Sequence, residues 1–312
     1  APQSTSLTRI NTISNPIPIN EMLGVEQEKI ISPPSQDVID NMKFIFNSMN
    51  KNNVPEKSNE LKQLLSTDNI IKWFSNFFIV NRISVENNNH QSYNELISLI
   101  DNKELNNYLI KDTIHYIQNL LTSETLDKEL KEKNLLKNLG SWLGLMTLNR
   151  NKPILAKDLD LKDILIDAYQ TGKLGPIVTF ISKILEHSAK TKVFHGKNPW
   201  VQGILSLLSE LNSNPDLKPN LTFEIENLFK KLDLDLKTYQ KSKMLETLTI
   251  PSNSPDFVNI PSNQNNNKVI NTNNSNLSPT NKNNQNEQIN IQELYYRILH
   301  LDNYMIEVLS NL

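Results

Sequence analysis

The sequence predicts an all-α fold, a right-handed stack of antiparallel helical pairs with disordered flanks, and three observations lead to this class. Apolar residues recur at intervals of three and four positions over most of the chain, as they do on amphipathic helices. The alternation of half-buried β-strands is absent apart from short ambiguous runs. Only seven of the 312 residues are glycine, which is few for a β-fold dense in turns.

The spacing of the polar connections indicates how the helices are arranged. Connections at 82–90, 149–158 and 190–199 lie roughly 40 to 70 residues apart, and repeats built from one helical pair run to about 40–47 residues. We therefore expect a HEAT-like solenoid of about five repeats, each packed on its neighbours. Because no repeat is visible as a sequence copy, an irregular helical bundle is the alternative.

Composition divides the chain into four zones. Residues 1–34, rich in Ser, Thr, Asn and Pro, are expected to form an extended N-terminal arm, and 35–240 hold nearly all the periodic pattern of the scaffold domain. Residues 241–288 are predicted to be an Asn-rich disordered linker, since 262–288 hold twelve Asn and few apolar residues. Residues 289–312 resume a three-and-four spacing and predict an amphipathic helix.

Within the central zone the pattern predicts about ten helices in succession. Asn198 places a capping side chain before Pro199 at the first helical position, and Gly175 with Pro176 opens the preceding helix in a similar way. The predicted helices cover about 35–49, 56–66, 68–81, 90–100, 103–121, 126–149, 160–171, 175–188, 198–213 and 221–232.

Composition and charge exclude several classes of protein. The formal net charge of −2 argues against a dedicated nucleic-acid binder, which would carry a basic footprint. No stretch approaches the ~18–20 apolar residues of a membrane span, and the N-terminus lacks a signal-peptide pattern. The absence of cysteine excludes disulfide scaffolds, thiol nucleophiles and cysteine-bound zinc.

No motif of enzyme chemistry is present. The histidines show neither an i, i+4 metal pair nor an HExxH motif, and there is no GxSxG elbow. The glycines at 172 and 175 flank a lysine but lack the spacing of a phosphate-binding loop. We therefore predict no catalytic residue, no cofactor, no metal site and no small-molecule substrate. An enzyme whose site converges from distant positions stays an alternative. The histidines are His90, His115, His187, His195 and His300.

Gly140 and Gly144 lie four residues apart within one predicted helix. Each glycine costs about 1 kcal/mol relative to alanine in a helix interior, so two on one face predict that a neighbouring helix approaches closely there. Trp142 between them is either a core residue or a recognition residue on the surface.

Two locally basic connections are the candidate partner surface. Loops of a stacked array can line up along a rim, so we predict that Arg150, Lys152 and Phe194 contact an acidic partner. The alternative is that these loops are simple solvated connections with Phe194 and Trp200 buried.

Ten short motifs occur in order over about 30–240: Ile45–Asn47, Arg82–Glu86, His90–Tyr93, Asn138–Gly144, Thr147–Leu148, Asn151–Ile154, Leu165–Tyr169, Val193–Phe194, Asn198–Trp200 and Leu221–Glu226. Together they resemble the central domain of the large Not scaffold subunit of the Ccr–Not deadenylase complex. One departure stands before Asn198, where Gly196 and Lys197 replace two expected prolines.

The resemblance implies a helical-repeat domain like the middle domain of eukaryotic initiation factor four-G, without catalysis of its own. It implies docking of a Caf-type poly(A) nuclease and of a DEAD-box RNA helicase, contact with other Ccr–Not subunits, and contact with RNA through these partners. The implied role is mRNA deadenylation, decay and translational repression, in the cytoplasm and, as a second compartment, the nucleus.

Three further readings remain open. One is a translation-initiation scaffold that binds an initiation-factor-4A-like helicase, and another is direct RNA binding. The third concerns residues 289–312, which either dock back on the array, pair with another chain or begin a further module.

Overall fold

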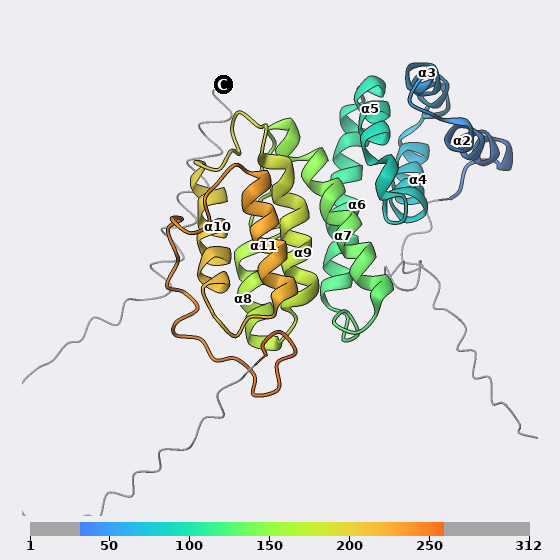
Figure 1. Cartoon of the computed structure of the whole chain (residues 1–312). Coiled ribbons are helices and arrows are strands. Elements are labelled where there is room, and N and C mark those ends of the chain that lie inside the picture. The colour runs from blue at the N-terminus through green and yellow to red at the C-terminus, as the bar shows by residue number, and fades with distance from the viewer. Residues whose placement is uncertain (1–31, 259–312) are drawn as a thin grey trace, which may run out of the picture. The chain divides into compact units, whose positions relative to one another are not determined.

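A computed structural model describes residues 32–258 of the chain, and over this range the fold is all-α (Figure 1). The predicted class is confirmed, since ten α-helices follow one another there and none of these residues forms a named strand. The helices are α2 (Gln36–Ser48), α3 (Val54–Leu64), α4 (Asp68–Phe78), α5 (His90–Ile100), α6 (Lys103–Leu121), α7 (Leu130–Met146), α8 (Leu161–Thr171), α9 (Leu174–Leu185), α10 (Pro199–Asn212) and α11 (Pro219–Lys231).

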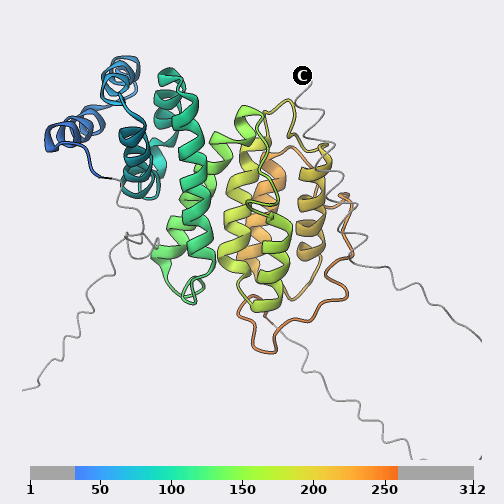
Figure 2. The ribbon, with the colours of Figure 1, turned by 180° about the vertical axis from the view of Figure 1, so that it is seen from behind.

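The helices form two layers, as expected for stacked pairs. The odd-numbered helices α3, α5, α7, α9 and α11 pack in succession, while in the second layer α4 packs on α6 and α8 on α10. Contacts of α2 with α3, α6 with α7, α8 with α9 and α10 with α11 join the layers. The two views show the layering, because α11 lies in front in Figure 1 and behind in Figure 2.

Polar side chains cap several helices, whereas α9, predicted to open at Gly175 and Pro176, begins at Leu174 without a side-chain bond from its N-cap residue. Asn198 accepts a hydrogen bond from the Trp200 backbone N–H at 2.9 Å, directly before Pro199, as predicted. Asn102 caps α6 and Asp160 caps α8 in the same manner. The largest boundary shift is at α7, which begins at residue 130 rather than 126, because residues 125–129 form a turn.

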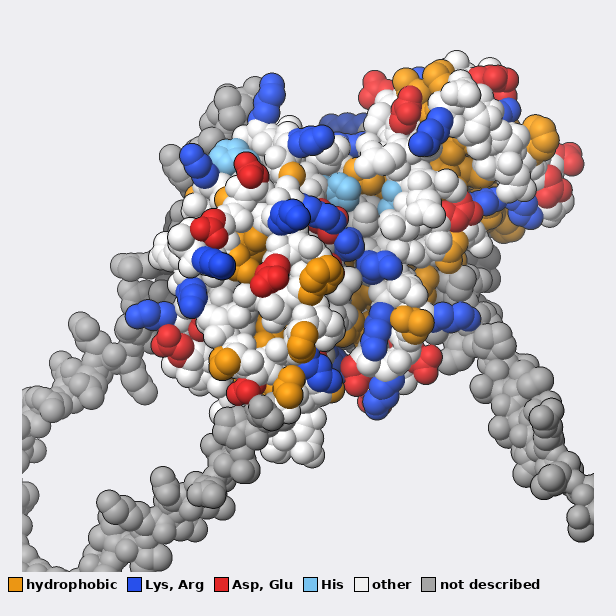
Figure 3. Space-filling model, in the orientation of Figure 1, with side chains coloured by type: hydrophobic (Ala, Val, Ile, Leu, Met, Phe, Trp, Pro, Cys, Tyr) orange, Lys and Arg blue, Asp and Glu red, His pale blue; other side chains and the backbone are white. Residues whose placement is uncertain are grey.

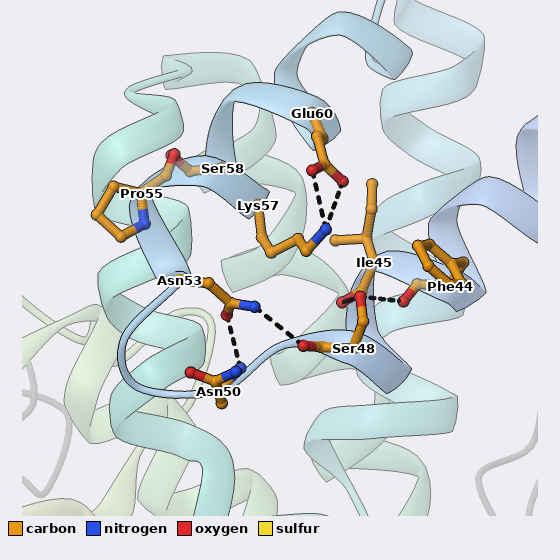
Figure 4. Close-up of polar contacts among 9 residues, drawn as sticks. All are labelled: Phe44, Ile45, Ser48, Asn50, Asn53, Pro55, Lys57, Ser58 and Glu60. Carbon is orange, nitrogen blue, oxygen red and sulfur yellow. Dashed lines mark hydrogen bonds and ion pairs between the residues drawn. The ribbon is translucent and has the colours of Figure 1, made fainter.

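The connection between α2 and α3 is closed by asparagine side chains (Figure 4). Asn53 donates to the Ser48 carbonyl at 3.0 Å and accepts from the Asn50 backbone N–H at 2.7 Å. The nearby Lys57 is buried, pairs with Glu60 at 2.8 Å and lies over an exposed aromatic ring, Phe44, of α2. These contacts fix the first helical pair without a long apolar loop.

The N-terminal half of the core is aromatic. Phe46 stacks with Phe74 and Phe78, and the ring of Tyr93 meets Phe46 and Phe78 edge-on. Trp142 of α7 is fully buried and also meets Phe78 edge-on. Of the two readings offered for Trp142, the structure supports the core residue, which ties α7 to the first repeats.

The glycine pair of α7 sits where α9 approaches most closely, as predicted. A Cβ placed on Gly140 would lie 2.7 Å from a ring carbon of Phe180 and 3.0 Å from its carbonyl oxygen. A Cβ on Gly144 would lie 2.6 Å from the Ile184 carbonyl oxygen. Because the colliding atoms include backbone, only glycine permits this helix–helix distance. We call this contact the α7–α9 seam.

Residues 241–258, which composition assigned to the disordered linker, instead pack on the helices. We call this segment the strap. Glu210 accepts hydrogen bonds from the backbone N–H groups of residues 244 and 245, at 3.1 and 2.9 Å. Asp256 accepts from the backbone N–H groups of Leu174 and Gly175 at the start of α9. The prediction failed here because the segment is held by two buried carboxylates and by buried Leu245 and Phe257, a pattern too sparse to show as periodicity.

The remaining predicted zones fall largely outside the described residues. Only residues 32–34 of the N-terminal arm, and none of 259–288 or of the predicted C-terminal helix at 289–312, belong to the described part.

Candidate partner-binding surfaces

Within residues 32–258, no helix is long and apolar enough to cross a membrane, and no three His, Asp or Glu side chains are grouped as metal ligands. A groove of about 800 Å³ lies beside α10 and α11, where Asp233, Asp235 and Lys230 are among the lining residues. Its mixed charges favour no particular ligand. The informative features are therefore on the surface of the array.

Two of the predicted loop connections meet, and the third does not join them. The side-chain oxygen of Asn151 accepts hydrogen bonds from the backbone N–H groups of Lys192, at 3.1 Å, and Val193, at 3.0 Å. The α7–α8 and α9–α10 connections are thus side by side. The connection at 82–90 instead packs on the middle of α7, because Asn138 donates to the Ser84 carbonyl at 2.7 Å.

Arg150 acts as an internal brace. Its guanidinium donates to the side chains of Asn94 at 2.7 Å and Ser98 at 3.0 Å on α5, and of Asn106 at 2.9 Å on α6. Burial lowers the pKa of the guanidinium. Arg150, predicted to contact a partner, therefore uses its N–H donors to hold α5 and α6 to the end of α7.

Lys152, two residues further on, is exposed. Its pKa is lowered first by partial desolvation and then by the like charges of Arg150 and Lys103. The first turn of α6 and the α7–α8 connection therefore contribute to one positive region. Lys152 remains a candidate for partner contact.

Phe194 does not belong to the surface. Its side chain is 2 % exposed and meets the partly buried Trp200 edge-on at 6.1 Å between ring centroids. The prediction that Phe194 contacts a partner is contradicted by this burial, and the alternative reading of a core aromatic holds. The loop turns inward here because Asn198 donates to the Val193 carbonyl at 3.0 Å.

The face formed by α9 and α11 carries paired charges. Lys183 and Lys231 both contact Glu186, at 2.6 and 2.7 Å, and Lys183 also approaches Glu224 at 3.9 Å. Burial acts to raise the pKa of Glu186, but hydrogen bonds from the two lysines outweigh it and lower the pKa. Figure 3 shows blue and red side chains interspersed on this face. The lysines and glutamates of this face therefore neutralise one another through ion pairs.

A stacked aromatic pair on α4 is a surface feature that periodicity alone did not single out. Trp73 and Phe77 stack at 5.1 Å between centroids and are only partly buried. Ser75 of the same helix hydrogen-bonds to α6, and at 100° per residue it lies about 160° around α4 from both rings. The aromatic pair is therefore opposite this contact, with Asn76, which also bonds to α6, at the border between the two sides. The sequence did contain a sign of this surface, because α4 has more apolar residues than one buried stripe requires.

Two histidines pack against α7, His90 fully buried and His187 half-buried. His187 is 3.3 Å from the Ser141 hydroxyl, and desolvation lowers its pKa to about 4 despite the nearby Glu186. His90 contacts the Ile83 carbonyl and packs edge-on against Trp142, and its pKa is also lowered by burial. Both rings are packing elements.

Comparison with known proteins matches nearly the whole described body. The model of the CCR4-NOT transcription complex subunit 1 CAF1-binding domain matches residues 30–254. The chain is similar to CCR4-NOT transcription complex subunit let-711 of Caenorhabditis elegans, with 39% identity over 223 residues, 69% of this chain and 8% of that protein.

Two yeast proteins, each called general negative regulator of transcription subunit 1, are also similar. The Saccharomyces cerevisiae protein is 37% identical over 212 residues, covering 68% of this chain and 10% of the relative. The Schizosaccharomyces pombe protein is 34% identical over 209 residues, covering 67% and 10%. The chain thus spans about a tenth or less of the length of these curated relatives.

Proposed function

This chain belongs to the family of CAF1-binding domains of CCR4-NOT transcription complex subunit 1, and from that membership we propose that it is a non-catalytic scaffold that docks a Caf-type poly(A) nuclease. The observation that carries the proposal is the match over residues 30–254, which coincides with the folded body at 32–258. The family resemblance inferred from the sequence is confirmed by the same match. The removal of adenylates belongs to the nuclease, while the scaffold holds it near target mRNA.

The proposal assigns nuclease docking to the aromatic pair of Trp73 and Phe77. Long-lived protein complexes bury apolar surface, and Trp is enriched among the residues that dominate binding energy. The pair is stacked and partly held by the core, so little side-chain entropy is lost when a partner covers it. This side of α4 faces away from α6, so docking there leaves the packing of the repeats intact.

A pull-down with the full chain tests both statements. The wild-type chain should retain a Caf-type nuclease, and the double variant Trp73→Ala/Phe77→Ala should bind it at least tenfold more weakly. Phe44→Ala/Phe223→Ala is the matched control, since both rings are 63 % exposed elsewhere on the array. Failure of the wild-type chain to retain the nuclease would overturn the function. Equal retention by the two double variants would overturn only the choice of surface.

We further propose that the chain docks a DEAD-box RNA helicase. This proposal rests on the family resemblance, as do translational repression, contact with other Ccr–Not subunits and residence in the cytoplasm and nucleus. A scaffold stimulates a two-lobed helicase by binding one arrangement of its lobes more tightly than another. The helicase's RNA-dependent ATPase rate should therefore rise in the presence of the chain, and an unchanged rate would count against this docking. An initiation-type scaffold would instead prefer an initiation-factor-4A-like helicase in the same assay.

A further inference from the structure

One edge of the array concentrates positive charge from three connections. Residues 101–103, 149–153 and 189–198 hold six of the 32 Lys and Arg residues of the chain but only one of its 34 acidic residues, Asp101. The whole chain has a net charge of −2, so the rest of it is acidic. We call this region the basic edge, and its cations are Lys103, Arg150, Lys152, Lys190, Lys192 and Lys197.

The three connections form one continuous surface. Asn151 binds the backbone at residues 192 and 193, which joins the second connection to the third. Arg150 donates to Asn106 in the first turns of α6, which joins the second connection to the first. The like charges of Arg150 and Lys103 also act on Lys152. Lys103, Arg150 and Lys152 are therefore close enough for their charges to repel.

The lysines of the basic edge have no carboxylate partner within residues 32–258. The ion pairs of that range lie on α2 to α4, at Arg82, and on the face of α9 and α11. All five lysines are exposed. Lys103 and Arg150 crowd Lys152, and none of the ion pairs within residues 32–258 offsets this charge. This is the arrangement expected of a surface that meets an external polyanion.

We propose that the basic edge binds the phosphate backbone of single-stranded RNA. Protein partners anchor on exposed aromatic or aliphatic side chains, yet none of the large exposed apolar side chains of residues 32–258 lies in these three segments. Phe194, the aromatic residue within them, is buried. A ribose-phosphate chain needs only cations and polar groups along its path, and the edge offers both, with Asn149 and Asn151 on either side of Arg150.

This inference rests on the proposed function, because the substrate of a docked nuclease is an RNA tail. An edge that holds RNA weakly raises its concentration near the nuclease without contributing to catalysis. Binding should be independent of sequence, since backbone contacts carry no base information. With four or five phosphate contacts, affinity should fall roughly 50- to 130-fold between 50 and 200 mM salt.

Fluorescence anisotropy with the full chain tests the proposal. The probes are fluorescein-labelled 20-nucleotide oligoadenylate and oligouridylate, titrated at 50 and 200 mM NaCl. The edge variant is Lys152→Glu/Lys192→Glu, and the matched control is Lys62→Glu/Lys131→Glu, which changes net charge equally at exposed lysines of α3 and α7. We expect the edge variant to bind both probes at least tenfold more weakly at 50 mM NaCl, and the control to stay within about threefold of the wild type.

Three outcomes would overturn the proposal. They are a wild-type chain that leaves both probes unbound at 50 mM NaCl, equal losses in the edge variant and its control, and an edge variant that keeps RNA affinity but loses a protein partner. The nuclease pull-down is run on the same variants. An edge variant that loses RNA but retains the nuclease separates this inference from the proposed function, and a failed pull-down with intact RNA binding defeats the function alone.

Discussion

The α7–α9 seam and the basic edge are adjacent regions with opposite construction. At the seam, Gly140 and Gly144 let two helices approach until no Cβ fits between them, and the neighbouring side chains are buried. At the edge, lysines from three connections are exposed and form none of the ion pairs found within residues 32–258. Packing alone explains the seam, whereas packing within residues 32–258 gives no reason for the exposed lysines of the edge. Stability and recognition are thus expected to depend on different residues, and the following predictions test that separation.

Gly144→Ala gives the largest expected loss of stability. A Cβ there would lie 2.6 Å from the Ile184 carbonyl oxygen, so the helices must shift, at a cost of about 2–3 kcal/mol. Gly203→Ala in α10 is the control, since its Cβ would meet only the end of the Lys162 side chain at 3.4 Å and helix propensity favours alanine by up to about 1 kcal/mol. Urea unfolding should give opposite signs for the two variants. Equal changes in the free energy of unfolding would show that the seam can accommodate a Cβ at Gly144.

Acid should weaken the seam through His187. Its pKa is lowered to about 4 in the folded chain, against about 6.5 when unfolded. Above pH 6.5 the ring is neutral in both states and the stability is fully present. As the pH falls from about 6.5 to 4, the unfolded state takes up the proton first, and on the order of 2–3 kcal/mol is lost.

The variant His187→Gln isolates this contribution. Its free energy of unfolding, measured by urea titration at several pH values, should change less over that window than that of the wild type. His90, whose pKa is also lowered, contributes to the remaining slope with the same sign. A variant with the wild-type slope would rule out His187 as its source.

Asp256→Ala tests whether the strap belongs to the folded body. Its carboxylate accepts two backbone hydrogen bonds at the start of α9, and loss of such a cap costs about 1–2 kcal/mol. Glu246→Ala, at an exposed position of the same strap, should stay within about 0.5 kcal/mol of the wild type. Thermal unfolding followed by circular dichroism compares the two. An unaffected Asp256→Ala variant would mean that the strap contributes nothing to stability.

Arg150 and Lys152 provide the smallest and most local contrast. Arg150→Ala removes hydrogen bonds to α5 and α6 and should cost about 1–2 kcal/mol. Lys152→Ala removes an exposed cation crowded by like charges and should change stability by less than about 0.5 kcal/mol. Urea unfolding of both variants measures the difference. Equal destabilisation would contradict the assignment of Arg150 as a structural residue and Lys152 as a surface residue.

Periodicity predicted the helices well because burial of one stripe dominates each of them. The glycine pair was equally readable, since two glycines in a helix interior need a steric reason. The roles of the loop residues were harder to predict from the sequence. Phe194 looked like a loop aromatic, but its burial depends on the turn that Asn198 closes, a contact between neighbouring loops that spacing does not reveal.

The strap and the basic edge could not be predicted from the sequence for the same reason, because both depend on contacts between distant segments. The strap is held by Glu210 and Asp256, single carboxylates far from the backbone groups they bind in sequence. The edge is assembled from connections about 40 residues apart, and its unity depends on Asn151 bridging two of them. Arg150 and Lys152 were singled out together, yet only the fold shows that one braces helices and the other faces solvent.

The central claim is that this chain is a rigid platform whose function is to hold a nuclease. Sedimentation velocity of the full chain mixed with an equimolar Caf-type nuclease tests it most directly, with each protein alone as reference. The account predicts one faster boundary that contains both proteins, and no shortening of oligoadenylate by the chain alone. Two boundaries that sediment as the separate proteins would contradict it.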